Sequence, residues 1–144
     1  MSAKLSLHTE DFEKLRLASI QPGDVFLGEL EGVDHEKFFV IAGVSGDRVL
    51  CCSVLINSQI NPFIKKRPHM LERQLELLAA DYEFLSHDSF VNCAQPLKSK
   101  LEFFASTGYR YRGSLKEEDV KIIKDFLITS GQLTQEEIDT YFPA

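Results

Sequence analysis

Residues 37–56 read KFFVIAGVSGDRVLCCSVLI, and this stretch decides the fold of the 144-residue chain. Its two halves, residues 37–44 and 48–56, are rich in apolar and β-branched residues, which favour strands. The turn-forming triplet SGD at residues 45–47 separates them. The sequence therefore predicts a β-hairpin whose near-continuous apolar strands are buried on both faces or belong to a strongly coiled sheet.

A leading helix over residues 9–19 is predicted from the signals at its start. Thr9 can cap a helix, and the acidic residues that follow it suit the positive end of the helix dipole. The dipeptide PG at residues 22–23 then breaks the chain, and residues 25–30 favour a first strand.

The region after the hairpin mixes loop and strand signals. Residues 57–68 carry two prolines and the run KKR, which predict an exposed loop. Residues 89–93 are predicted as a strand, and residues 102–105 as a further short one. Residues 70–80 have a helix-forming composition, yet residues 74–77 alternate as a strand would, so the pattern alone leaves both structures open.

The C-terminal region carries two helix-start signals. Ser114 and Glu117 have the spacing of a capping box, and apolar residues then recur on one helical face until Gly131. Thr134 and Glu137 repeat the spacing and predict a short terminal helix.

The composition is that of a globular domain, with 44% hydrophobic and 26% charged residues. A formal net charge of -6 argues against nucleic-acid binding by bulk charge, although a local basic patch fits it. Cys51, Cys52 and Cys93 lack metal-site spacing and are predicted to be buried free thiols. Without an apolar run long enough for a bilayer, we expect a soluble, cytoplasmic protein of one domain, with no metal and no cofactor.

Five segments together resemble one known family. They are PGDV at 22–25, HEKFFVIA at 35–42, LCCSV at 50–54, VNCAQP at 91–96, and GSL at 113–115 with the helix that follows it. In this order they are similar to the motifs of the MazF/PemK growth-inhibitor toxins. The resemblance runs over residues 22–128 and favours a strand for residues 74–77.

The resemblance implies a mainly β fold with α: a small SH3-like (PemK/MazF-type) β-barrel with a C-terminal amphipathic helix. The helix signals outside the resemblance add short flanking helices. Residues 1–20 would form an N-terminal helical extension, 22–128 the barrel and its helix, and 132–144 a short terminal helix of the same single domain, 1–144. It also implies a homodimeric, metal-independent endoribonuclease that cleaves single-stranded RNA and is restrained by an antitoxin protein, with no membrane association.

Three positions depart from the family's catalytic pattern. Lys37 stands where the family has an Arg, which keeps the charge but loses the two-point guanidinium fork. Asn92 and Ala94 stand where it has an Arg and an Asp. The candidate catalytic residues are therefore Lys37, Asn92 and the neighbouring pair His87 and Asp88, an imidazole and a carboxylate that suit acid–base chemistry. A turn in which Asp88 binds local backbone N–H groups is the competing interpretation, and His35 is interpreted as a solvated turn residue.

Two basic segments are candidates for RNA binding. One is Lys65, Lys66 and Arg67 in the predicted loop, and the other alternates rings and guanidinium groups at Tyr109, Arg110, Tyr111 and Arg112. The alternative interpretation is a solvated basic turn for the first segment and a strand with one solvent-exposed face for the second.

Two other functional classes stay open. A non-catalytic SH3-like barrel that binds a peptide or nucleic acid fits the loss of the catalytic Arg and Asp. A small-molecule enzyme built on Cys51 or Cys52 lacks a neighbouring base in the sequence.

Overall fold

The structure is a computed structural model that describes residues 9–29 and 35–144. It is a mixed α/β protein built on a seven-stranded antiparallel sheet with the strand order β4-β5-β3-β2-β1-β7, in which β6 also pairs with β3. The strands are β1 (Asp24–Glu29), β2 (Glu36–Val44), β3 (Leu50–Asn57), β4 (Gln74–Leu77), β5 (Ser89–Asn92), β6 (Leu97–Lys100) and β7 (Arg110–Ser114).

The predicted hairpin is confirmed as β2 and β3, the centre of the sheet. Their register pairs Phe38 with Ile56 and Val44 with Cys51, with an irregularity between Ile41 and Gly43. The other edge of β3 is shared, because its first half pairs with β6 and its last residues pair with β5. Strand β3 thus joins three partners.

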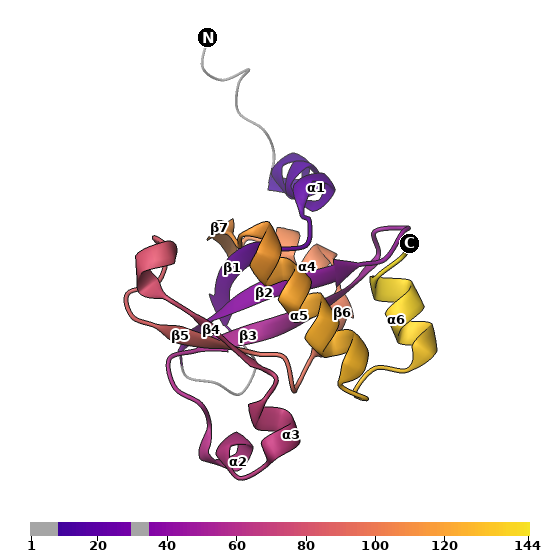
Figure 1. Cartoon of the computed structure of the whole chain (residues 1–144). Helices are drawn as coiled ribbons and strands as arrows, with labels where there is room; N and C mark the ends of the chain where they lie inside the picture. Colours follow the sequence, from indigo (N-terminus) through magenta and orange to yellow (C-terminus); the bar gives the residue numbers. More distant parts are fainter. Residues whose placement is uncertain (1–8, 30–34) are drawn as a thin grey trace.

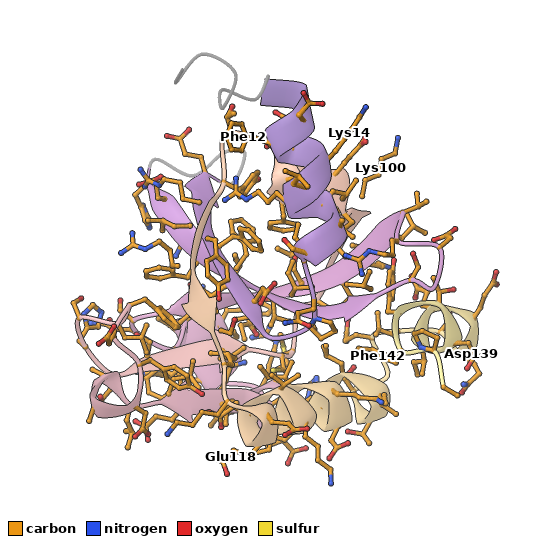
Figure 2. All side chains as sticks on the ribbon, turned by 90° about the horizontal axis from the view of Figure 1, so that it is seen from above. Phe12, Lys14, Lys100, Glu118, Asp139 and Phe142 are labelled. Carbon is orange, nitrogen blue, oxygen red and sulfur yellow. The ribbon has the colours of Figure 1, made fainter. Side chains whose placement is uncertain are left out.

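Helices cover both faces of this sheet, which agrees with the first of the two arrangements expected for the apolar strands, burial on both faces. The helices are α1 (Thr9–Ser19), α2 (Pro62–Lys65), α3 (Pro68–Leu71), α4 (Glu102–Ala105), α5 (Glu117–Thr129) and α6 (Gln135–Tyr141), with a 3-10 turn at Ala79–Asp81. Figure 2 shows α1 and α5 on opposite sides of the sheet. The leading and terminal helices, and the strand preferred for residues 74–77, are confirmed.

The protein has two hydrophobic cores, and the adjacent cysteines of β3 lie one in each. Cys52 belongs to a buried cluster with Ile123 and Leu127 of α5, whereas Cys51 belongs to a second cluster with Leu101 and Phe104 beneath α4. Successive strand residues point to opposite faces, so the pair divides between the cores. The described cysteines, Cys93 included, are free and buried, as predicted.

Two local predictions were wrong. Residues 102–105 form α4 and not a strand, because the buried residues there, Leu101, Phe104 and Ala105, follow helical spacing. The Ser114 capping box does not form: α5 begins at Glu117, and the Ser114 hydroxyl donates to Asp24 Oδ1 at 2.9 Å instead.

The segment predicted as an exposed loop, residues 57–68, contains the single turn α2, whose Ile64 is buried. Asn61 caps this turn with its side chain, which accepts from the backbone N–H of Phe63. The prediction of a loop is therefore confirmed on either side of α2 but is wrong for α2 itself.

The two ends of the strand order, β4 and β7, do not pair with each other in the described residues, so the SH3-like barrel stays a prediction. None of the helices within residues 9–29 and 35–144 has the length and hydrophobicity needed to cross a membrane.

Candidate functional site

A small cleft opens where β2 begins and β3 ends, beside the loop that precedes β5. Its volume is about 160 Å³. We call it the Lys37 cleft; it is lined by His35, Glu36, Lys37, Phe38, Ile56, Asn57, Ser58, Leu85, Ser86, His87 and Ser89. Two of the predicted catalytic residues, Lys37 and His87, therefore meet here although 50 positions separate them in the sequence.

Lys37 is held by the strand register. Because Phe38 pairs with Ile56 in antiparallel β2 and β3, Lys37 faces Asn57 one step further along. The half-buried Lys37 ammonium donates to Asn57 Oδ1 at 3.0 Å. This hydrogen bond fixes the cation at the wall of the cleft and leaves its other N–H donors for a ligand.

His87 is exposed on the opposite wall, in the loop that leads into β5. Its Nδ1 lies 2.9 Å from Ser86 Oγ, and the backbone carbonyl of His87 accepts from Ser89 Oγ at 3.0 Å. The first contact orients the ring, and the second holds the backbone of the loop. When Nδ1–H donates to Ser86, Nε2 carries the lone pair that a general base needs.

The side chains of the other two predicted catalytic residues form hydrogen bonds within the fold. Asp88 Oδ1 accepts from the N–H of Ala79 at 2.8 Å, so it binds a backbone N–H, as the competing interpretation expected, but one nine positions away and not in its own turn. The buried Asn92 side chain accepts from Gln74 and donates to Gln95, both at 2.9 Å. Neither Asp88 nor Asn92 is among the described residues that line the Lys37 cleft.

The first basic segment is only partly free to bind RNA. Lys65 and Lys66 are exposed, but the Arg67 guanidinium lies 3.4 Å from the centre of the Phe63 ring and donates to the Phe63 carbonyl at 2.8 Å. These contacts hold Arg67 against its own turn. Figure 1 draws α2 and α3 below the sheet.

The second basic segment divides between core and surface. The Tyr109 ring packs against Phe39 and Phe104 with centroid distances of 5.5 and 5.0 Å, and burial raises the pKa of its hydroxyl. Arg110 Nη2 bonds both carboxylate oxygens of Glu36, at 2.8 and 2.9 Å, whereas Arg112 is exposed. Arg110 thus contacts one lining residue of the Lys37 cleft, Glu36, but none of residues 109–112 is among the described residues that line the cleft.

The cysteines do not make a nucleophilic site. Burial raises the pKa of Cys51 and raises the pKa of Cys52 to about 12, so both thiols are protonated near neutrality. Within residues 9–29 and 35–144, no three histidine, cysteine, aspartate or glutamate side chains gather in a way that would hold a metal ion.

Sequence reasoning passed over three residues of the Lys37 cleft. His35 was interpreted as a solvated turn residue, and it is exposed at a bend, but it also lines the cleft with His87. Asn57 and Ser86 gave no signal, because their roles depend on which strand and loop the chain brings beside Lys37 and His87. His35 precedes β2 and His87 precedes β5. Both strands pair with β3, and this pairing brings the two histidines to one cleft.

Comparison with models of known protein families gave no match, and none of the curated proteins compared with the chain matched it. The geometry of the Lys37 cleft and the motifs of the sequence are therefore the features that indicate a function.

Proposed function

We propose that the protein is the toxin-like component of a toxin–antitoxin system and a metal-independent endoribonuclease that cleaves single-stranded RNA in the Lys37 cleft. The observation that carries this proposal is the meeting of Lys37 with His87 and His35 in one small cleft. One ammonium group and two imidazoles supply the charge and the proton transfers that RNA cleavage requires.

The reaction assigned to this cleft is attack by a ribose 2′-oxygen on the adjacent phosphorus. His87 Nε2 takes the 2′-hydroxyl proton while Ser86 holds the Nδ1–H. The bond from phosphorus to the 5′-oxygen breaks, His35 gives a proton to that oxygen, and a 2′,3′-cyclic phosphate remains. Lys37, positioned by Asn57, stabilises the negative charge that develops on the phosphate oxygens.

The wider features of the proposal come from the MazF/PemK-like motifs. They include the SH3-like barrel, a homodimer, a cytoplasmic location, and an antitoxin segment that occupies the RNA groove. Support comes from the order of the matching segments, which fall on β1, β2, β3, β5 and the β7–α5 junction. The exposed Lys65, Lys66 and Arg112 are assigned to the RNA backbone further from the cleft.

A second candidate is a non-catalytic domain that binds single-stranded RNA or a peptide at the same place. The observation that favours it is the structural use of Asp88 and Asn92, together with Ala94, which has no functional group. In this case Lys37 and His87 contact a ligand without breaking it.

The test is incubation of the purified chain with mixed-sequence single-stranded RNA in EDTA, with products resolved at nucleotide resolution. We expect discrete fragments that end in 2′,3′-cyclic phosphate, and their loss in Lys37→Ala and His87→Ala. His69→Ala is the matched control, because His69 is exposed and outside the cleft. Cleavage that survives in both cleft variants would contradict the site. RNA that binds by fluorescence anisotropy but stays intact would establish the second candidate.

A further inference from the structure

A larger groove lies between α5, the C-terminal residues and the turn of the β2–β3 hairpin. Its volume is about 710 Å³, within the usual range of roughly 300–1,000 Å³ for small-molecule sites. We call it the Lys121 groove. Its lining contains none of the residues assigned to RNA. Figure 2 shows one of its lining residues, Phe142, between α5 and α6.

The floor and walls of the Lys121 groove are apolar. Ala42 of β2, Val120 and Phe142 line it with apolar side chains, and Val44 also lines it. Gly43 makes this shape by having no side chain, because a Cβ there would lie 2.8 Å from the Phe142 ring. The C-terminal residues can therefore pack directly against the strand and close one side of the groove.

The charges around this apolar floor are mostly positive. Arg48, Lys121 and Lys124 line the groove against one acid, Glu117, in a chain whose formal net charge is -6. Lys121 and Lys124 are three positions apart on α5 and so share a face. Neither takes part in an ion pair found within the described residues.

Two of these cations have fixed positions. Lys124 Nζ lies 5.9 Å from the centre of the Phe142 ring. Arg48 has a backbone φ of 60°, a left-handed conformation that suits glycine, and its Nη2 donates to the carbonyls of Leu17 and Ile20 at 2.8 and 2.5 Å. Arg48 is thus tied to the end of α1 while it lines the groove, and its left-handed backbone closes the turn of the β2–β3 hairpin.

We propose that the Lys121 groove binds a small organic anion with an apolar body, whose carboxylate, sulfonate or phosphate group pairs with Lys121 and Lys124. The apolar floor takes the body, and the ammonium groups of Lys121 and Lys124 take the charge. Because the rest of the chain is acidic, its field directs an anion to this groove rather than to the surface in general. This site is independent of the Lys37 cleft and of any RNA cleavage.

The probe for this site is 8-anilinonaphthalene-1-sulfonate, titrated into the folded full chain and followed by fluorescence and calorimetry at low and high salt. We expect saturable binding to one site, weakened roughly tenfold or more in Lys121→Gln/Lys124→Gln, since each 1.4 kcal/mol lost is a factor of ten. The control is Lys14→Gln/Lys100→Gln, which removes two exposed charges outside the groove. Circular dichroism checks that both double variants stay folded.

Competition identifies the anionic group. Displacement of the probe by decanoate assigns a carboxylate ligand, and displacement by adenosine monophosphate assigns a phosphate ligand. Binding that does not saturate, that weakens equally in both double variants, or that neither competitor displaces would overturn the proposal. An acidic peptide that displaces the probe when both small competitors fail would replace the small anion by a macromolecular partner.

Discussion

The ring of Tyr109 lies directly over the backbone of Gly28, so closely that a methyl group on Gly28 would overlap it. The Tyr109 hydroxyl continues across β1 and donates to the carbonyl of Glu29 at 3.2 Å. A glycine inside a strand is normally unfavourable, and here it makes room for a ring to pack on the backbone. The contact joins β1 to the residues that precede β7.

Gly28→Ala is therefore expected to destabilise the protein by about 1–3 kcal/mol, because the added methyl must push Tyr109 away from Phe39 and Phe104. Urea unfolding measures the loss. Gly46→Ala is the matched control: nothing lies within 4 Å of a Cβ at that position, so its change should stay within about 0.5 kcal/mol. Equal losses in the two variants would show that the ring is not packed as described.

Alkaline pH is expected to destabilise the fold through its thiols. Burial raises the pKa of Cys52 and Cys93 to about 12 from an ordinary value of 9.0, so the unfolded chain loses these protons first. The stability from the protonated thiols is complete below about pH 9 and falls as the pH rises towards about 12. Unfolding free energies across this window should fall less steeply in Cys93→Ala, and an unchanged slope would rule out this source.

Tyr82→Phe is expected to cost about 1–2 kcal/mol, because one buried hydroxyl serves two partners. It donates to Asp119 and accepts from the N–H of Lys116 at 2.9 Å, at the start of α5. Burial first, and then the bond to Asp119, raises the pKa of Tyr82 above the ordinary range. Titration at 295 nm should show one fewer late-ionising tyrosine in the variant. Tyr111→Phe removes an exposed hydroxyl that bonds only the Ser114 hydroxyl among the described residues, at 2.7 Å, so its cost should be smaller than that of Tyr82→Phe.

Variants of the α6 capping box can distinguish the contribution of a hydrogen bond to stability from that of an ion pair. Thr134 accepts from the Glu137 N–H, and the Glu137 carboxylate accepts from the Thr134 N–H and from Lys98. Thr134→Ala should destabilise by about 1 kcal/mol. Glu137→Gln keeps the box but removes the ion pair, so it should be milder than Glu137→Ala, and its own cost relative to the unchanged protein should be largest at low salt. Thermal midpoints measure the order, and an equal effect of Gln and Ala would assign the whole contribution to charge.

The parts of the fold that the sequence predicted depend on neighbours in the chain. Thr134 and Glu137 cap a helix because they are three residues apart, and residues 37–56 form a hairpin because their turn is short. The Ser114 prediction failed because its hydroxyl binds Asp24, 90 positions away. Local spacing contains no information about such a partner.

The same distinction applies to the Lys37 cleft. The residue types of Lys37 and His87 made them candidates, and the sheet brings them together through the pairing of β3 with β5. Asp88 had the same signal in sequence, but a backbone N–H at Ala79 uses its carboxylate. Whether a polar side chain faces a cleft or its own backbone is decided by tertiary packing, which no single motif records.

The pairing of β3 with β5 also sets when the Lys37 cleft comes into existence. One wall is made by residues 35–58 and the other by residues 85–89, and Ile56 pairs with Val91 between them. During synthesis the hairpin can form while the second wall is still inside the ribosome. The growing chain therefore has no complete cleft until β5 has emerged. Neither binding nor catalysis in the cleft can begin during the first half of translation.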